Sequence, residues 1–157
     1  MTKKINILIG DDNFIEAFTY QIFSNEYIPK LQNQVPSYTF NWKLEIKPET
    51  VIRNAQTGKY DIVITDLDYC GYGTGKEGYE VVDKISEMPS RPLLILCTSS
   101  NNIQEINERT KGKIDFRAGG CPGRHKFDDL INFLIEYYSD KQKTMQNNIQ
   151  IDCKEVN

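Results

Sequence analysis

Acidic side chains directly follow two of the most apolar segments of the sequence. The run INILIG (5–10) is followed by Asp11 and Asp12, and the run DIVITD (61–66) ends in Asp66. A third apolar run, PLLILC (92–97), is followed by Thr98. Two carboxylates about 4 Å apart repel by roughly 4 kcal/mol at an intermediate effective dielectric, so a group of them stays ionised only when it shares a cation. The pattern predicts a cation site if these segments end close together.

Magnesium is the cation that such a site favours. Hard oxygen ligands bind Mg²⁺ through one or two carboxylates, together with waters and phosphate oxygens. A carboxylate beside the ion can attack phosphorus and form an acyl phosphate, while a nearby hydroxyl or cationic side chain stabilises the transferring group. The residues that end these runs therefore indicate phosphoryl chemistry with Mg²⁺ as the cofactor.

The three apolar runs have the composition of strands that are covered on both faces. They are rich in Ile, Leu and Val without strict alternation, which is typical of a parallel sheet. Residues 39–47 alternate apolar with polar side chains and predict a half-buried strand nearer a sheet edge, and residues 113–118 are a candidate fifth strand. Helical periodicity is found at residues 14–32, 49–57, 78–88, 101–111 and 127–138.

Strands and helices alternate along the whole chain. This order predicts an α/β fold, a doubly wound five-stranded parallel sheet with right-handed crossovers and helices on both faces. Ligands of such sheets bind at the carboxyl ends of the strands, near the point where the strand order reverses. The acids and the threonine are therefore expected on one rim.

Composition limits the protein class. The 157 residues, 39% apolar and 26% charged, suit one domain, which we expect to span 1–138, followed by a polar, flexible tail at 139–157 with a possible short strand at 149–156. A net charge of −3 argues against direct nucleic-acid binding. The sequence has no signal-peptide pattern and no segment near the ~18 apolar residues of a membrane span. Four widely spaced cysteines without a Cys-x-x-Cys pair predict free thiols in the cytoplasm.

The order of these residues on successive strand ends resembles the receiver domain of two-component response regulators. The resemblance rests on Asp11 and Asp12, on Asp66 at the third strand end and on Thr98-Ser99 at the fourth, and it covers roughly residues 4–138. It implies a flavodoxin-like (CheY-like) sheet with strand order 2-1-3-4-5 in a stand-alone, single-domain response regulator.

The resemblance also implies a role for each residue. Asp66 would be the phosphoacceptor, Thr98 the hydroxyl that turns toward the phosphate, and Phe116 the switch aromatic of the fifth strand. The donor would be a histidine kinase or phosphotransfer protein, and the output a contact with a downstream protein, without nucleic acid or membrane. Only self-phosphorylation and self-dephosphorylation are implied as activities. The implied magnesium ligands are Asp11, Asp12, Asp66 and the backbone carbonyl of Asp68.

Three segments depart from the family pattern. Residues 28–39, with two prolines, predict a longer surface loop before the second strand, and the glycine loop at 71–78 is longer than the usual turn after the phosphoacceptor. The family carries a lysine directly at the end of strand five. In this sequence the end of the strand lies in the segment FRAGGCPGRHKFDDL (116–130), which has no lysine at that position. Lys126 and Arg124 are the cations that could replace it, and we favour Lys126.

Two other functions fit the same residues. A pseudo-receiver would keep the fold and act as a phosphorylation-independent binding module, which the altered strand-five segment favours. The segment ITDLDYCGYGTG (64–75) also resembles the Asp-x-Asp nucleophile motif of haloacid-dehalogenase-type phosphohydrolases, with Asp128 and Asp129 as a late acid pair. In that family the nucleophile strand opens the core, whereas here it is the third strand.

Overall fold

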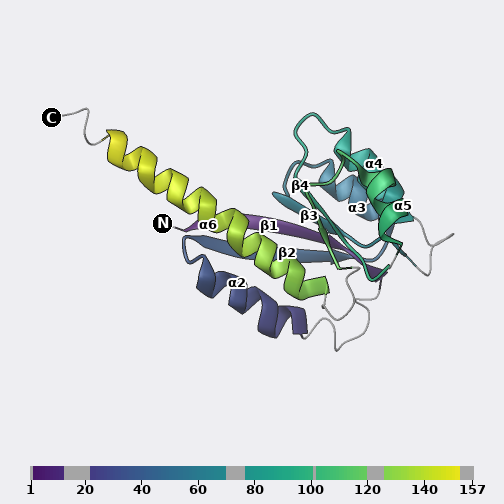
Figure 1. The fold of residues 1–157 in the computed structure, drawn as a ribbon, viewed down its shortest axis with the longest axis horizontal. Coiled ribbons are helices and arrows are strands. Elements are labelled where there is room, and N and C mark those ends of the chain that lie inside the picture. The colour runs from purple at the N-terminus through teal and green to yellow at the C-terminus, as the bar shows by residue number, and fades with distance from the viewer. Residues whose placement is uncertain (1, 13–21, 70–76, 101, 120–125, 153–157) are drawn as a thin grey trace.

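The strands form one parallel sheet in the computed structural model of the chain (Figure 1). The structure describes residues 2–12, 22–69, 77–100, 102–119 and 126–152, with side chains up to residue 144. The strand order is β2-β1-β3-β4-β5, which confirms the predicted doubly wound five-stranded sheet of order 2-1-3-4-5. The strands are β1 (Lys3–Gly10), β2 (Tyr38–Glu45), β3 (Ile62–Thr65), β4 (Leu93–Cys97) and β5 (Phe116–Ala118).

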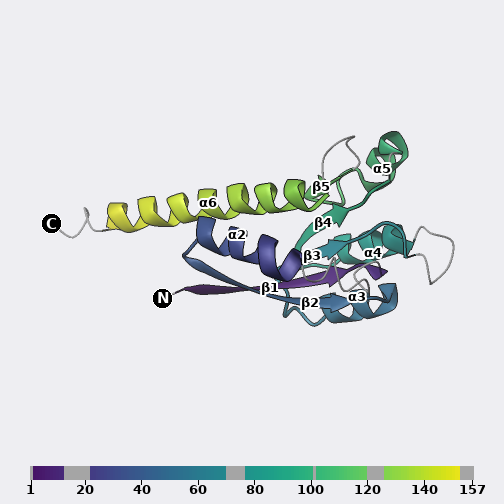
Figure 2. The same cartoon turned by 90° about the horizontal axis from the view of Figure 1, so that it is seen from below.

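Helices cover both faces of this sheet (Figures 1 and 2). One layer contains η2 and α2, together with α6, and the other contains α3, α4 and α5. The bounds of these helices are η2 (Phe23–Tyr27), α2 (Ile28–Gln34), α3 (Pro48–Ala55), α4 (Glu77–Ser86), α5 (Ile103–Thr110) and α6 (Lys126–Asp152).

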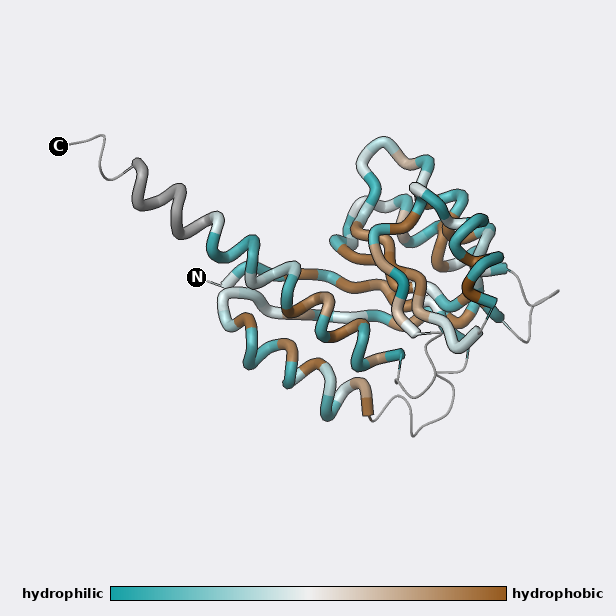
Figure 3. Tube along the Cα trace, in the orientation of Figure 1, coloured by the Kyte–Doolittle hydropathy of each residue, from teal (hydrophilic) through white to brown (hydrophobic). Residues whose placement is uncertain are grey.

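Alternate strand residues fill two separate cores. Ile7 and Ile9 of β1 pack in the cluster that contains α2 and α6, whereas Leu8 between them packs in the cluster that contains α3, α4 and α5. Successive side chains of a strand point to opposite faces of the sheet, so a sheet covered on both sides needs runs that are apolar throughout. Figure 3 shows this as brown strands between the helix layers.

The parallel register brings the carboxyl ends of the central strands level with one another. Gly10, the last residue of β1, lies opposite Thr65, the last residue of β3. Thr65 in turn lies opposite Leu96, one residue before the end of β4. The residues that follow these strands therefore leave the sheet at the same rim.

Two predictions overlap at residues 28–32: the helix at 14–32 is confirmed from residue 22 onward, and the surface loop at 28–39 is wrong over its first half. Residues 28–34 are helical and continue directly from η2. The N–H of Ile28 donates to the carbonyl of Phe23, five residues earlier, and the next residue, Pro29, has no N–H to donate. The wide π-helical turn thus accommodates the proline, and the fully buried Leu31 anchors α2 in the core. Residues 14–21 of the predicted first helix lie outside the described residues.

The last helix is longer than the sequence predicts. The predicted helix ends at residue 138, whereas α6 continues unbroken to Asp152, so residues 149–152 are helical and not part of the possible short strand at 149–156. Residues 139–152 contain no glycine or proline to end the helix. On its exposed side Asp140 pairs with Lys143 at 3.2 Å, and the Thr144 hydroxyl donates to the Asp140 carbonyl. Local propensity therefore extends α6 past the sheet, and Figures 1 and 2 show the projecting part.

The structure describes one of the four cysteines, and it allows a search for membrane-spanning helices. Cys97, at the end of β4, is a buried free thiol. Cys70, Cys121 and Cys153 lie outside the described residues. Within the described part of the chain, no helix combines the length and apolar character needed to cross a membrane.

Asp115 connects β4 to the turn before β5. Its carboxylate accepts two hydrogen bonds from the Arg91 guanidinium, at 2.6 and 2.8 Å, and one from the Leu94 N–H at 2.7 Å. Burial alone would raise the pKa of Asp115, but the bonds from Arg91 and Leu94 outweigh it and hold the pKa below its ordinary value. The ionised carboxylate is therefore the form that stabilises the fold.

We expect Asp115→Asn to lower the free energy of unfolding by about 1 kcal/mol at neutral pH. Because the folded pKa lies below the unfolded one, this stabilisation is present above the unfolded pKa of about 3.9 and disappears as pH falls through the folded value. Urea unfolding at neutral pH measures the loss of stability in the variant, and urea unfolding at about pH 3 measures how far that loss disappears in acid. Asp83→Asn is the control, because Asp83 pairs with Lys113 on the surface and should matter little. Equal stability of the two variants at neutral pH would contradict the prediction.

Candidate functional site

The strand ends bring the predicted polar residues to one rim of the sheet. Asp11 and Asp12 follow β1, Asp66 follows β3, and Thr98 follows β4. All are buried, with 3%, 9%, 5% and 0% of their surface exposed, respectively. Charged side chains are seldom this buried unless they are paired or bind a metal, so the rim is a chemically unusual part of the molecule.

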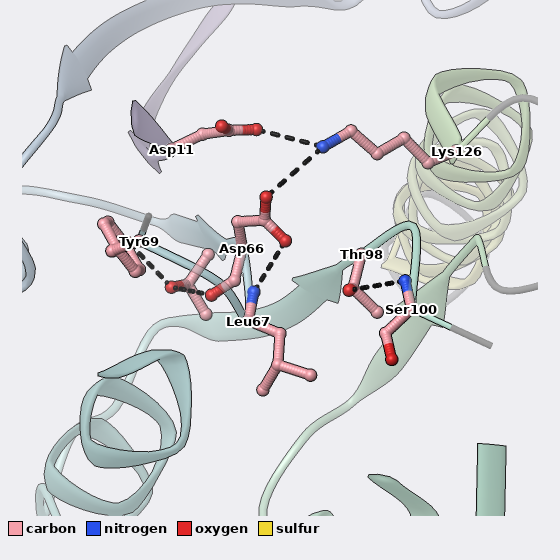
Figure 4. Close-up of polar contacts among 8 residues, drawn as sticks. Asp11, Asp66, Leu67, Tyr69, Thr98, Ser100 and Lys126 are labelled. Atoms are coloured by element: carbon pink, nitrogen blue, oxygen red, sulfur yellow. Dashed lines mark hydrogen bonds and ion pairs between the residues drawn. The ribbon is translucent and has the colours of Figure 1, made fainter. Parts of the chain in front are cut away.

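The ammonium group of Lys126 lies between two of these acids. Its Nζ is 3.1 Å from Asp11 Oδ2 and 3.6 Å from Asp66 Oδ2. Figure 4 shows the three side chains pointing toward one another. Lys126 is the first residue of α6, so this cation reaches the rim from the helix after β5 and not from the strand itself. Arg124, the other predicted cation, lies outside the described residues.

Burial makes Asp66 an unusually weak acid. Loss of hydration is the largest influence and raises its pKa to about 6, while Lys126 and the Leu67 N–H favour the ionised form. Burial alone would lower the pKa of Lys126, but the charges of Asp11 and Asp66 raise it well above its ordinary value. Lys126 is therefore a permanent cation, whereas Asp66 loses its proton just below neutral pH.

The backbone around Asp66 is fixed from two sides. The Asp66 N–H donates to the Gly10 carbonyl at 2.8 Å, and the Leu67 N–H donates to Asp66 Oδ1 at 2.7 Å. Gly78, which closes the predicted glycine loop, lies in the first turn of α4, where a Cβ would overlap the Asp66 carbonyl. Only glycine allows α4 to approach so closely. With Oδ1 bound to Leu67, Oδ2 is the oxygen turned toward Lys126.

Thr98 lies at the predicted strand end, but its hydroxyl is bound within its own loop. Thr98 Oγ1 accepts a hydrogen bond from the Ser100 N–H at 3.1 Å, as Figure 4 shows. The Thr98 N–H donates to the Ala118 carbonyl of β5 at 3.0 Å. Gly119 follows with a φ of +86°, and a Cβ there would overlap the Thr98 carbonyl. The strand-five end thus packs tightly on Thr98, a constraint that the sequence analysis did not identify.

Phe116 couples the fifth strand to the last helix. Its half-buried ring stacks on Phe133 of α6, with the ring centroids 4.1 Å apart and the planes 3° from parallel. Phe133 continues the stack to Tyr137 one turn later, at 5.9 Å. A change in the Phe116 rotamer would therefore change the surface that α6 presents.

The rim gathers several acidic side chains. Asp11, Asp12 and Asp66 are all buried there, and among the described residues the Lys126 ammonium contacts Asp11 and Asp66. The pKa of the buried Tyr69 phenol is raised by burial and then by the charges of Asp11, Asp66 and Asp12, so all three acids are near enough to act on it. A divalent cation would be attracted to such a group of acids.

The oxygen donors of the rim fit magnesium in particular. Among the described residues no three acidic, histidine or cysteine side chains form a ready-made metal cluster. Mg²⁺ usually needs fewer, because it keeps several waters and binds one or two carboxylates together with a phosphate. Asp68, half-buried, is close enough to Asp66 for its charge to raise the Asp66 pKa, and its backbone carbonyl is a further candidate donor.

Solved structures share this arrangement of strands and helices. A CheY-like response regulator receiver domain from Methylobacillus flagellatus matches with a TM-score of 0.56 and 15% identity, over 85% of this chain and 97% of that one. The chain has the fold of a response regulator receiver domain. At this level of identity the likeness establishes the receiver fold alone. No family model and no curated protein matches the sequence.

Two further receiver-fold structures contain bound Mg²⁺. The receiver domain of a sensor histidine kinase from Pseudomonas aeruginosa, with magnesium coordinated in the active site cleft, matches with a TM-score of 0.58 and 14% identity, over 87% of this chain and 98% of that one. The response regulator TrrA from Thermotoga maritima, in complex with Mg²⁺ and BeF, matches with a TM-score of 0.54 and 18% identity, over 83% and 98%.

Proposed function

We propose that this chain is a response regulator receiver domain, which accepts a phosphoryl group on Asp66 from a phosphohistidine of a histidine kinase or phosphotransfer protein. One observation carries the proposal: the Lys126 ammonium contacts both Asp11 and Asp66 at the carboxyl rim of a receiver fold. A structural ion pair would need one acid and one base. Here one ammonium group contacts two buried acids on different strand ends, as expected of a site that binds a further cation and a phosphate.

Asp66 is suited to be the nucleophile. Its pKa of about 6 leaves the carboxylate ionised in neutral solution, and Oδ2 faces the cation while Oδ1 is held by the Leu67 N–H. In the transfer, a carboxylate oxygen bonds to phosphorus as the phosphorus–nitrogen bond of the donor breaks. The electron pair of that bond stays on the imidazole nitrogen, which then takes up a proton. Lys126 stabilises the charge on the phosphoryl oxygens.

The residues that would hold Mg²⁺ are Asp11, Asp12, Asp66 and the backbone carbonyl of Asp68. When bound, the ion would supply positive charge to the acids of the rim and to the phosphoryl oxygens. Lys126 adds a positive charge beside Asp11 and Asp66. Phosphorylation and cation binding are therefore expected to depend on one another.

The response to phosphorylation is proposed to pass through Thr98 and Phe116. The Thr98 hydroxyl would exchange its bond with the Ser100 N–H for one with the phosphoryl group, and Phe116 would turn inward and leave Phe133. Changing the ratio of the switched to the unswitched conformation from about 1:99 to 99:1 takes roughly 5.5 kcal/mol of differential stabilisation. The output would then be a changed protein contact on the Phe116 and α6 side of this cytoplasmic protein.

Intact-mass measurement after incubation with acetyl phosphate and MgCl₂ tests the function. We expect the mass of one phosphoryl group to be added to the wild-type protein, and we expect the addition to be lost in Asp66→Asn and when EDTA replaces MgCl₂. Asp61→Asn is the matched control, because Asp61 lies at the opposite end of β3 and should not affect the reaction.

Each other outcome identifies a different function. No added mass with acetyl phosphate or with a phosphorylated histidine phosphotransfer domain would favour a pseudo-receiver. Steady hydrolysis of a phosphate ester that survives loss of Asp11 and Asp12 would favour the phosphohydrolase. In the structure Asp128 and Asp129 lie in the first turn of α6, where they do not end a strand as a late acid pair would.

A further inference from the structure

We infer that Tyr69 is a positioning residue that sets the distance between the acid pair after β1 and Asp66 after β3. The inference rests on the proposed function, since it concerns how the same site is assembled. Tyr69 follows Asp66 by three residues and is fully buried, with 0% of its surface exposed. A tyrosine buried this deeply is expected to have a partner for its hydroxyl.

The Tyr69 hydroxyl belongs to a chain of hydrogen bonds that ends on Asp66. The Thr65 hydroxyl donates to the Asp66 carbonyl at 3.0 Å, and Tyr69 Oη lies 2.9 Å from Thr65 Oγ1. A threonine hydroxyl has a single hydrogen, which this bond to Asp66 uses. Tyr69 must therefore donate to Thr65, and the order of the chain is Tyr69 to Thr65 to the Asp66 carbonyl (Figure 4).

The same hydroxyl also touches the other strand. A Cβ added to Gly10 would overlap Tyr69 Oη and would lie 2.7 Å from Cγ2 of Val51. The phenol thus fills the space beside Gly10, the residue directly before Asp11. Gly10 has an ordinary backbone conformation, since it is not among the residues with positive φ. What requires a glycine at position 10 is the presence of Tyr69 and Val51, not the shape of the chain.

These contacts close a ring between the two strand ends. Gly10 accepts a hydrogen bond from the Asp66 N–H at 2.8 Å, Thr65 binds the Asp66 carbonyl, and Tyr69 binds Thr65 and packs on Gly10. Each peptide group next to the phosphoacceptor is held by this ring. The spacing of Asp11 and Asp66, which the cation and Lys126 must bridge, therefore depends on the Tyr69 hydroxyl.

Tyr69→Phe removes the hydroxyl and keeps the ring. We expect the affinity for Mg²⁺, measured by calorimetric titration of MgCl₂ without phosphodonor, to fall roughly three- to tenfold, which is the range for one lost neutral hydrogen bond. Phosphoryl uptake from acetyl phosphate should fall by the same factor at low MgCl₂ and return to the wild-type rate at saturating MgCl₂. Tyr60→Phe is the matched control, because Tyr60 lies before β3 at the opposite end of the sheet and its loss of a hydroxyl should change neither quantity.

The pair Gly10→Ala and Tyr69→Phe tests the packing part of the inference. Gly10→Ala alone should lower the thermal midpoint strongly, because its Cβ meets the phenol oxygen. In the double variant the midpoint should recover part of that loss, so that the two changes are not additive. Additive losses would show that Tyr69 does not define the space at Gly10.

The outcomes separate this inference from the proposed function. If the wild-type protein takes up no phosphoryl group and binds no Mg²⁺, the proposed function fails and the inference fails with it. If the wild-type protein does both and Tyr69→Phe keeps wild-type Mg²⁺ affinity and uptake at low MgCl₂, the function stands and the inference is overturned. A lower thermal midpoint with unchanged Mg²⁺ affinity would likewise reduce Tyr69 to a core residue and overturn it.

Discussion

Replacing Asp66 with asparagine is expected to stabilise the folded protein by about 2–3 kcal/mol at neutral pH in the absence of divalent cations. The pKa of Asp66 is about 6 in the folded protein, compared with an ordinary value of 3.8, and burial is the main cause. One pKa unit corresponds to about 1.4 kcal/mol. Keeping this carboxylate ionised at neutral pH therefore costs the folded state about 2–3 kcal/mol, which is the gain expected from the substitution. Asparagine has the same shape and no charge, so the cost disappears.

The same pKa fixes the sign of the pH dependence. The folded state binds the Asp66 proton more tightly than the unfolded state, whose carboxyl has a pKa of about 3.9. This contribution therefore makes the wild-type protein more stable as pH falls from about 7 toward 4. The advantage of Asp66→Asn should be largest above pH 7 and should vanish near pH 4.

Urea unfolding in EDTA at about pH 7.5, 6 and 4 measures this difference. Asp140→Asn serves as the control, because Asp140 is exposed on α6 and pairs with a neighbouring lysine on the surface. If Asp66→Asn is no more stable than wild type at about pH 7.5, Lys126 already balances the Asp66 charge and the prediction is wrong. Added MgCl₂ should stabilise the wild-type protein and leave Asp66→Asn nearly unchanged, since binding to the folded state adds to its stability.

The sheet could be predicted because its signals are local. Each strand is short, apolar and covered on both faces, and a parallel sheet places all carboxyl ends at one rim. The positions of Asp11, Asp66 and Thr98 on that rim follow directly from the sequence. Two local signals conflict at α2, because the helical period runs to residue 32 whereas Pro29 favours a loop from residue 28. The packing of Leu31 and the wide turn at η2 decide for the helix.

Contacts across the rim could not be predicted in the same way. Lys126 is separated from Asp11 by most of the chain, and its reach depends on where α6 begins relative to β5. Gly10 and Gly78 resemble loop glycines in the sequence, but each is required by a neighbour distant in sequence, Tyr69 for Gly10 and the Asp66 backbone for Gly78. A glycine that ends a strand before an acid is the one signal that could have suggested close packing there.

Lys126→Met is expected to slow phosphoryl uptake from acetyl phosphate by about 10- to 100-fold at saturating MgCl₂. Lys126 is the cation nearest Asp66 Oδ2 among the described residues. The hydrogen bond that it would donate to a charged phosphoryl oxygen is worth about 1.5–3 kcal/mol. Each 1.4 kcal/mol of lost transition-state stabilisation is about a tenfold lower rate. Methionine keeps most of the volume of the lysine stem, so the variant tests the charge and not the packing.

Two control variants separate the position of the charge from its presence. Lys113→Met also removes one positive charge, but Lys113 pairs with Asp83 on the surface, and its uptake rate should match wild type. Lys126→Arg retains the charge with a different shape and should recover part of the rate. Equal rates for Lys126→Met and Lys113→Met would show that the contacts of Lys126 with the acids have no role in the transfer.

The stability of Lys126→Met should respond to magnesium more strongly than that of the wild-type protein. Without Lys126 the acids Asp11 and Asp66 lose the cation that contacts both, and removing one partner of a buried pair typically costs about 3–5 kcal/mol. Protonation of Asp66 relieves part of this cost, because Lys126 no longer lowers its pKa. The rim then carries one positive charge fewer, so Mg²⁺ should bind more tightly even as uptake slows. A calorimetric titration with MgCl₂ distinguishes this opposite change in affinity and rate from a general loss of structure, which would weaken both.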